Sequence, residues 1–479
     1  MNRLFPIAMV VAFIALITAC TDDEHFSTSS AYSLSFSVDT LTFDTAFNNT
    51  TTPTKSLWVY NRTDHNLRLS SVRLAGGTST GFRVNVDGES MGQGSAEEIG
   101  DVEIRKKDSL RIYVDLQTPA DQSEAFLPIT DELVLRLESG VEQRIPLNAA
   151  SWKAVRLRDV HISRDTTFSS PSVPMVVYGD LTVDSAATLT IGAGTTLYFH
   201  ENAGLRVYGT VRTQGTADQP VTLRGDRLDH MFDYLPYDRT PGQWQGVHLY
   251  ASSYGNDWQY TDLHSAYDSI VPDSAALSDS KLILNSCTVH NNQGYGVWAR
   301  NCRMTMLNTQ ITNALHDCLY VDGGEVTINN CTIGQFYPFD GGRGAAFTFT
   351  NNSPLQRLTV ENSLITGYAD DVVMGMQSDT TKAFHYAFNY CVLRTPRVTT
   401  ADSVYFSHVI YENLKDTVGT SDHHFRKMDI DNFIYDFSLD STSVAIGAAN
   451  TATALPTDRL ARPRDEEPDA GAYEYVKTD

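Results

Sequence analysis

The sequence predicts an all-β protein in which a β-sandwich precedes a parallel β-helix. A short phrase that recurs between residues 284 and 393 predicts the helix, and each copy ends on one apolar residue: Val289, Ile311, Ile333, Ile365 and Leu393. These residues lie 22, 22, 32 and 28 positions apart. A unit of 22 residues with several short strands is one coil of a parallel β-helix, and the longer intervals are coils with inserted loops. Apolar residues that alternate with polar ones from residue 32 to about residue 150 predict the sandwich.

The chain is strongly acidic, with a formal net charge of −22 over 479 residues and no cluster of Lys and Arg. Such a surface repels a phosphate backbone, so we expect no nucleic-acid partner. Two interpretations of the acidity stay open. The carboxylates keep an exposed protein soluble, or some of them bind Ca²⁺.

Residues 1–19 have the order of a lipoprotein signal peptide, with Arg3 before an apolar run over residues 7–17 that is too short to span a membrane. Ile17-Thr18-Ala19-Cys20 resembles a bacterial lipobox, which implies that Cys20 is the lipidated first residue of the mature chain. The acidic residues 21–24 resemble a surface-export signal of some Gram-negative bacteria. We therefore expect a protein anchored to the outer membrane or cell surface of a Gram-negative bacterium through this lipid, with residues 20–31 as a tether.

Residues 32–151 are predicted to form the sandwich. Apolar residues recur at every second position in several runs, among them Phe82, Val84 and Val86. Turn-forming pairs such as Gly76-Gly77 separate these runs. Short strands at this spacing, each with one buried side, favour two packed antiparallel sheets of the immunoglobulin-like type.

Residues 165–475 are predicted to form the β-helix and a C-terminal cap. Near the start, Tyr178-Gly179-Asp180-Leu181 is echoed 30 residues later by Tyr208-Gly209-Thr210-Val211. The last coil of a solenoid would otherwise expose apolar side chains, so we expect the tail after residue 443 to cover it. Within the tail, Arg462 or Arg464 is expected to pair with Asp469 or Glu474.

Three of the six cysteines occupy one position of the recurring phrase. Cys287, Cys331 and Cys391 share this position, and Thr309 and Ser363 fill it in the coils between them. Coils stack about 4.8 Å apart, so cysteines that skip a coil lie roughly 9 to 10 Å apart. This separation is too large for a disulfide. We expect an interior stack of small side chains, with neither a metal site nor a redox pair.

Taken together, the lipobox, the sandwich, the Asn285-Ser286-Cys287-Thr288-Val289 phrase and the ending Asp469-Ala470-Gly471-Ala472-Tyr473-Glu474 resemble right-handed parallel β-helix surface lipoproteins. The resemblance implies a fold and a location. It implies no single activity, because the broader family includes polysaccharide lyases, glycoside hydrolases and adhesins. Repeated Asp-Ser and Asp-Thr pairs are also similar to an O-glycosylation sequon of some bacteria, although such pairs favour turns for ordinary reasons.

Four residues are candidates for catalysis. The segment 368–373 contains Asp370 and Asp371 and resembles the paired-Asp strand of polygalacturonases, but the Gly-His-Gly and Arg-x-Lys elements of that family are absent. Asp317, with Asp322, flanks the corresponding strand two coils earlier and extends the expected groove. Arg343 is a candidate lyase base or substrate clamp. The alternative is that these carboxylates bond their own turns and that Arg343 pairs with a surface acid.

The insertion over residues 224–243 and the residue after it supply the binding candidates Tyr234, Tyr237 and Trp244. Long insertions between coils often line grooves, and the alternative is a packed loop that covers the side of the helix. His316, His423 and His424 lie apart from any spacing typical of a metal site, so no metal ligand and no cofactor are expected, apart from Ca²⁺ if the protein is a lyase.

Two hypotheses about the function remain open. The first is a surface lipoprotein whose β-helix binds a glycan or a matrix partner without catalysis. The second is a polysaccharide lyase or glycoside hydrolase that acts in a groove beside Asp317, Asp370 and Asp371.

Overall fold

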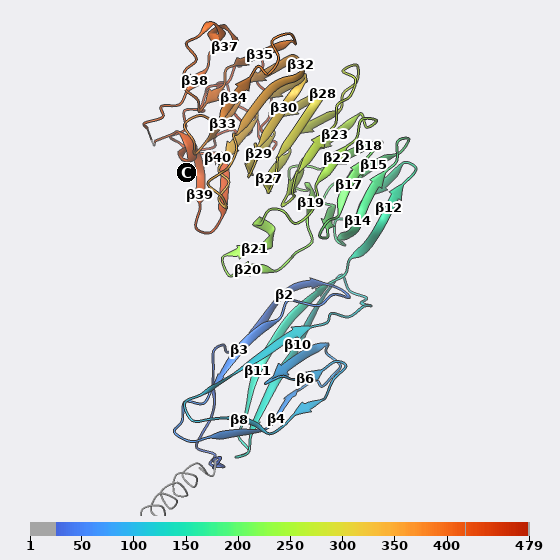
Figure 1. The fold of residues 1–479 in the computed structure, drawn as a ribbon, viewed down its shortest axis with the longest axis vertical. Coiled ribbons are helices and arrows are strands. Elements are labelled where there is room, and N and C mark those ends of the chain that lie inside the picture. The colour runs from blue at the N-terminus through green and yellow to red at the C-terminus, as the bar shows by residue number, and fades with distance from the viewer. Residues whose placement is uncertain (1–24, 417, 478–479) are drawn as a thin grey trace, which may run out of the picture. The chain divides into compact units, whose positions relative to one another are not determined.

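The computed structural model describes residues 25–416 and 418–477 (Figure 1). The chain divides into two compact units, one through Lys153 and one from Ala154. The expected signal peptide, the lipidation residue Cys20 and the acidic residues 21–24 lie outside the described residues. Within the described part, no helix combines the length and the apolar character that crossing a membrane requires.

The first unit is a β-sandwich, as predicted. One sheet has the strand order β1-β3-β9-β5-β6, and the other has the order β2-β11-β10-β4-β7 with β8 also on β4. The strands are β1 (Ser35–Phe36), β2 (Leu41–Phe47), β3 (Lys55–Tyr60), β4 (Leu67–Leu74), β5 (Phe82–Val86), β6 (Glu89–Gly92), β7 (Glu98–Ile99), β8 (Val102–Ile104), β9 (Ser109–Leu116), β10 (Phe126–Leu137) and β11 (Glu142–Trp152). All pairings are antiparallel except β2 with β11.

The alternation of apolar and polar residues along each strand accounts for the core of the sandwich. Phe82, Val84 and Val86 are buried, whereas Arg83 and Asn85 between them are half-buried. Buried apolar residues from both sheets form one cluster. Each strand therefore turns one side inward, as a period of two requires.

The second unit is a parallel β-helix with three faces. Strands β12 (Val155–Ile162) and β14 (Met175–Val183) open it. Strand β14 bends between two faces because its first half pairs with β16 and its second half with β17, and β12 pairs with both halves of β14. Residues 155–162, which lie between the ranges predicted for the sandwich (32–151) and the β-helix (165–475), thus form the first strand of the helix. The coils follow one another from β12 to β38 (Figure 1).

We name the faces by their strands. Face A contains β16 (Thr196–Phe199), β19 (Val221–Gly225), β24 (Thr261–His264), β27 (Thr288–Asn292), β29 (Gln310–Ala314), β31 (Thr332–Gln335), β33 (Leu364–Gly367), β36 (Val392–Leu393) and β38 (Ile410–Tyr411). Face B contains β17 (Gly204–Val207), β22 (Val247–Leu249), β25 (Ile270–Pro272), the first halves of β28 (Val297–Leu307), β30 (Leu319–Asn329) and β32 (Phe347–Glu361), and β34 (Val373–Met376). Face C contains β13 (Thr166–Phe168), β15 (Thr188–Gly192), β18 (Thr210–Gln214), β23 (Asn256–Gln259), β26 (Leu282–Asn285), the second halves of β28, β30 and β32, β35 (Phe384–Asn389) and β37 (Phe406–Ser407).

The recurring phrase forms the corner between faces C and A and the start of each face-A strand. Its apolar anchors pair with one another in register through five consecutive coils, from Val289 to Leu393, and all are buried. The corner residue has a positive φ between 45° and 56° in each copy: Ser286, Asn308, Asn330, Asn362 and Tyr390. Asn tolerates this left-handed conformation better than most residues, which explains its recurrence.

The interior position after each corner holds the small side chains that the sequence analysis expected. All five cysteines in the described residues are free and buried. Burial raises the pKa of the Cys287 thiol to about 11 and that of the other four thiols to about 12. These thiols are therefore protonated packing groups, and the prediction that they form no disulfide is confirmed for the described chain.

The C-terminal segment covers the side of the helix along face A. It contains η4 (Ser421–His424) and the antiparallel hairpin of β39 (Phe425–Asp429) and β40 (Ile434–Leu439), drawn in orange-red in Figure 1, whereas η3 (Ala401–Tyr405) belongs to the last coil, before β37. Phe425, Phe437 and Tyr473 pack with Phe336 and Leu364 of the helix in a second apolar cluster. The cover is thus lateral, and it buries the apolar side chains that face A turns outward.

The asparagine corners hold this cover in place. The Asn330 Nδ2 donates to the Asp469 carbonyl at 3.3 Å, and the Asn330 Oδ1 accepts from the Leu455 N–H at 2.9 Å. One coil earlier, the Asn308 Nδ2 donates to the Thr457 carbonyl at 2.8 Å. The same residues therefore turn the chain at each corner and bind the tail.

One of the predicted ion pairs in the tail is present. Arg464 Nη1 lies 2.9 Å from Glu474 Oε2, with only 2% and 5% of the two side chains exposed. The guanidinium also donates to the carbonyls of Asp469 and Gly471 and to Asn308 Oδ1. A buried charge pair with this many hydrogen bonds locks the tail against the coil corners.

Candidate functional site

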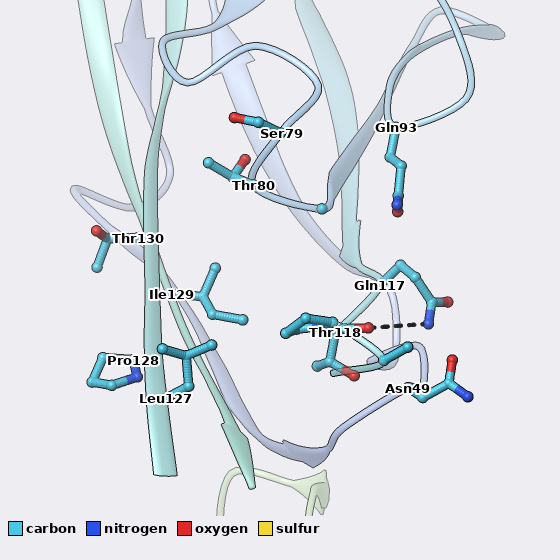
Figure 2. A pocket seen from close by; sticks show the side chains of 13 residues that line it. Asn49, Ser79, Thr80, Gln93, Gln117, Thr118, Leu127, Pro128, Ile129 and Thr130 are labelled. Carbon is cyan, nitrogen blue, oxygen red and sulfur yellow. Dashed lines mark hydrogen bonds between the residues drawn. The ribbon is translucent and has the colours of Figure 1, made fainter. Parts of the chain in front are cut away.

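A hollow of about 560 Å³ lies in the sandwich, and Figure 2 shows its lining. Its thirteen lining residues include Ser79, Thr80, Gln93 and Gln117, and none of them is titratable. The Gln117 Nε2 donates to the Thr118 carbonyl at 3.4 Å across one wall. The hollow therefore offers amide and hydroxyl groups but no titratable acid or base.

A second hollow, of about 410 Å³, lies on face B and gathers three of the four catalytic candidates. Asp317 precedes β30, Arg343 precedes β32 and Asp371 precedes β34, so the three residues enter from successive coils at one edge of the face. The side chains of Tyr320 and Met374 are among those that line the rest. We call this the face-B hollow.

Asp317 is fixed by the loop that carries Arg343. The Asp317 Oδ1 accepts from the Ala345 N–H at 2.7 Å. A Cβ on Gly344 would come within 2.6 Å of that oxygen, so the loop approaches this closely only because residue 344 is glycine. Burial raises the pKa of the Asp317 carboxyl, outweighing this hydrogen bond.

Arg343 and Asp371 are anchored but still reach the hollow. The Arg343 Nη1 donates to the Tyr337 carbonyl, and the guanidinium lies 4.9 Å from the centroid of the Tyr368 ring. The exposed Asp371 accepts from the Thr395 hydroxyl at 2.7 Å. Each side chain is thereby oriented by its neighbours.

The structure does not bring Asp370 into this hollow. Its side chain is 73% exposed and lies 3.2 Å from Arg394 Nη2. Asp371 on the next residue bonds Thr395 instead, so the adjacent carboxylates have separate partners. A paired-Asp arrangement is therefore wrong for these residues. Asp322 accepts from the hydroxyl of Thr350, its register partner in the next coil, at 2.9 Å, and also lies outside the hollow.

Aromatic rings stand beside the face-B hollow. Tyr295, Trp298 and Tyr320 project from this face or the turn before it, and their ring centroids lie 5.1 to 6.5 Å apart. The His316 ring lies 4.9 Å from that of Tyr295. Each of these side chains is half-buried or exposed, so the rings form a platform that solvent reaches.

The binding candidates near the 224–243 insertion have different environments. Tyr234 is 49% exposed and stacks on Phe433 of the tail hairpin at 6.2 Å. Tyr237 lies 3.8 Å from the guanidinium carbon of Arg227. Trp244 is only 1% exposed and stacks on Phe199 in the helix core, so the expectation that it binds a ligand is wrong.

Four titratable residues meet on face A, where the sequence analysis expected none. Asp262 and His264 project outward from β24 because Leu263, between them, points into the core. His290 projects outward from β27 because its neighbour Val289 points into the core. His264 Nδ1 lies 2.6 Å from Asp262 Oδ1, and His290 Nε2 lies 3.3 Å from the same oxygen.

The fourth residue, Asp238 of η2 (Tyr237–Arg239) in the insertion, reaches His264 from the other side, with 3.0 Å between its Oδ1 and His264 Nε2. Burial lowers the pKa of His264, but the two flanking carboxylates outweigh it and raise the pKa to about 9. The histidines hold the pKa of Asp262 well below its usual range despite burial. We call these four residues the Asp-His cluster.

A signal for this cluster was present in the sequence. An Asp-x-His on one strand places both side chains on one side of the sheet, and His290 is the register partner of His264 in the next coil. The sequence alone does not reveal the cluster, because the coil of β24 has no copy of the recurring phrase from which to set its register.

The histidines that the sequence analysis did consider are not in the cluster. His424 is fully buried between Glu412, at 3.1 Å, and Ser443, at 2.7 Å. Arg394 also binds Glu412, at 3.0 Å. This network ties the tail to the last coils and is structural.

The Asp-His cluster borders a third hollow, also of about 410 Å³. Its walls are strands β24, β27 and β29, η2, the β39–β40 hairpin and two tail residues, Arg459 and Tyr473. Thr288 and Asn313 line it with a buried hydroxyl and a buried amide oxygen that have no hydrogen-bond partner within the described chain. We call this the face-A hollow.

These features define the class: a β-helix protein with one face covered by its own C-terminal segment and a second face that presents charged and aromatic side chains. The comparisons with known proteins agree with the fold. Residues 273–391 match a family model described as right-handed beta helix region. The match covers 119 of 479 residues. The right-handed sense of the helix is the one that this family model describes.

No curated protein matches the chain significantly. Among solved structures, it is similar to a protein of unknown function from Porphyromonas gingivalis W83, at 15% identity and a TM-score of 0.19 over 25% of this chain and 46% of that one. It is also similar to a PapD-like domain of human CEP192, at 12% identity and a TM-score of 0.17 over 27% and 99%. A family 123 glycoside hydrolase from Clostridium perfringens is a third, at 8% identity and a TM-score of 0.18 over 29% and 31%. Likenesses this weak carry no argument about function.

Proposed function

We propose that the protein binds a glycan in the face-B hollow. The observation that supports this is the convergence of Asp317, Arg343 and Asp371, with Tyr320, on one hollow. Sugar hydroxyls both donate and accept hydrogen bonds, so carboxylates beside a guanidinium suit them. Aromatic rings offer flat apolar surfaces on which the C–H faces of sugar rings pack.

The charge of the hollow narrows the class of glycan. Two carboxylates line it against one guanidinium, and the whole chain carries −22. A polymer of uronic acids would meet repulsion on approach and inside the hollow. The proposed ligand is therefore a neutral or amino-sugar glycan, and this charge pattern disfavours a lyase that acts on acidic polysaccharides.

Glycoside hydrolysis is the second candidate function, and one observation favours it. Burial raises the pKa of Asp317, which suits a general acid that must hold its proton, while the exposed Asp371, two coils further along the same edge, could serve as base or nucleophile. Hydrolysis needs such a pair of carboxyls in which only one is ionised.

A glycan array tests the proposal. The soluble chain from residue 25 is expected to bind neutral or amino-sugar glycans, and the Asp371→Asn variant is expected to lose those signals. Asp218→Asn, an exposed carboxylate on another turn of the helix, is the matched control and should bind as the parent does. No signal from the parent protein, or equal signals from both variants, would contradict glycan binding in this hollow.

The products distinguish binding from catalysis. Each glycan that binds is incubated with the parent protein and analysed for shortened chains. Intact glycan supports the binding function, whereas cleavage that disappears in Asp317→Asn supports the hydrolase.

The proposed location is a lipid-anchored position at a Gram-negative outer membrane or cell surface. The lipobox-like segment ending in Cys20 and the acidic residues 21–24 support it. Metabolic labelling with a fatty-acid analogue is expected to mark the full-length protein but not Cys20→Ser, and surface protease should digest the marked protein in intact cells. Equal labelling of both forms would contradict the anchor.

A further inference from the structure

We propose that the Asp-His cluster on face A is a binding site for a divalent transition-metal ion of the zinc class, with Asp262, His264 and His290 as ligands. One ligand atom from each residue lies within 4.8 Å of the other two. Ligand atoms around tetrahedral zinc lie about 3.4 Å apart. A small rotation of the His290 ring, which is only half-buried, would bring the set to that spacing.

The ligand types select the metal. Two imidazole nitrogens and one carboxylate are the donors that zinc and its neighbours in the periodic table prefer, whereas calcium and magnesium prefer oxygen alone. Three protein ligands leave a fourth position for water or another molecule, as in metal sites that remain open.

Asp238 supplies the outer contact that such a site requires. Its carboxylate lies 3.0 Å from His264 Nε2, so it can accept the proton of that nitrogen and leave Nδ1 directed at the ion. Asp238 is itself paired with Arg224, which holds it in place. Because His264 is only 6% exposed, its ring has little freedom to leave this orientation.

Two further groups point to a bound molecule at this place. The Thr288 hydroxyl and the Asn313 amide oxygen are buried, line the face-A hollow next to the cluster, and have no hydrogen-bond partner within the described chain. Thr288 is the register partner of Asp262 in the next coil. A metal-bound water or a small polar molecule in the hollow would satisfy such groups, which otherwise cost about 1 to 3 kcal/mol each.

Metal binding by the untagged soluble chain tests the proposal. Dialysed protein is titrated with Zn²⁺ by calorimetry, and Co²⁺ is added separately to record the d–d absorption of the bound ion. We expect one Zn²⁺ per chain and a tetrahedral Co²⁺ spectrum. His290→Ala and the isosteric Asp262→Asn should each weaken Zn²⁺ binding at least 100-fold and abolish the spectrum, and Asp238→Asn should weaken binding about 10- to 100-fold.

His385→Ala removes an exposed histidine on face C and is the matched control, which should bind Zn²⁺ as the parent does. Circular dichroism checks that each variant is folded. Failure of the folded parent to take up one Zn²⁺, or an unchanged Co²⁺ spectrum in both ligand variants, would overturn the proposal. Glycan binding on face B uses other residues, so its outcome is independent of this one.

Discussion

At the scale of single residues, the asparagines at the coil corners have two structural roles, turning the chain and binding the tail. Each has a left-handed backbone, and Asn330 and Asn308 also bind the tail with their amides. A sequence pattern reveals the first task, because Asn recurs at a fixed position. It does not reveal the second, because the tail residues that accept these bonds lie more than a hundred positions away along the chain.

Because Asn330 both turns the chain and binds the tail, its replacement should lower the free energy of unfolding more than the replacement of a corner asparagine that only turns the chain. Asn330→Ala puts alanine in a left-handed conformation and leaves buried tail groups unpaired, so it should lower the free energy of unfolding by about 3 kcal/mol. Asn202→Ala, at an exposed corner with φ 65°, carries only the backbone cost and should lower it by about 1 kcal/mol. Urea unfolding measures both, and equal costs would contradict a role in binding the tail.

Asp469 makes the stability of the tail depend on pH. Burial and the nearby Glu474 raise its pKa to about 6, although N–H groups of Tyr475 and Gly447 bond the carboxylate. A folded-state pKa above the unfolded value of about 3.8 means that this residue stabilises the fold below pH 4 and that the contribution is lost as pH rises through 6. The change is at most about 3 kcal/mol.

The measurement is the difference in unfolding free energy between the parent and Asp469→Asn, taken from pH 4 to pH 7. The asparagine does not titrate, so the comparison isolates this one group. We expect the advantage of the parent to be larger at pH 4 than at pH 7. An advantage that is constant with pH, or that grows toward pH 7, would contradict the assigned direction.

At the scale of elements, the C-terminal segment is a structural partner of face A and one wall of the face-A hollow. Its apolar cluster with Phe336 and Leu364 excludes water from the outward side of the strands. Its hairpin residues 433–437 and Tyr473 line the hollow beside the Asp-His cluster. The sequence predicted a cover and left Arg464–Glu474 as one of several alternative ion pairs. It placed the cover over the last coil, because the outward apolar residues of face A are too scattered to reveal a covered side.

The Arg464–Glu474 pair predicts a non-additive result. Arg464→Met leaves Glu474 buried without its partner and should cost about 3 to 5 kcal/mol. Adding Glu474→Gln to that variant removes the stranded charge and should recover part of the loss. Thermal unfolding of the two single variants and the double variant measures this coupling, and strictly additive costs would show that the pair does not interact.

At the scale of the whole molecule, each unit has its own continuous core. The sandwich buries apolar residues from both sheets, and the β-helix buries a separate column through its coils. The soluble fragment 25–153 is therefore expected to fold alone and to unfold in one cooperative transition. Calorimetry of the fragment measures this, and a chain without a transition would contradict the independence of the sandwich.

Within the β-helix, the sequence predicted the parts that repeat better than the parts that do not. The anchors from Val289 to Leu393 and the unpaired cysteines follow from a fixed spacing, so their register could be read directly. Asp317, Arg343 and Asp371 could be placed on one edge because they precede strands of successive coils. Asp370 pairs with Arg394, and Asp238 reaches the Asp-His cluster from the insertion, and no local pattern encodes these contacts. The other three cluster residues lie on regular strands, but their coil pairing is not evident without a copy of the recurring phrase on β24.

The central claim is that the face-B hollow binds a glycan, and calorimetric titration of the best array ligand tests it most directly. Tyr320→Ala and Asp371→Asn, which both line the hollow, should each weaken the affinity at least about tenfold, which is 1.4 kcal/mol. Tyr113→Ala in the sandwich and Asp218→Asn should leave the affinity unchanged. An affinity that neither face-B variant lowers would contradict the claim.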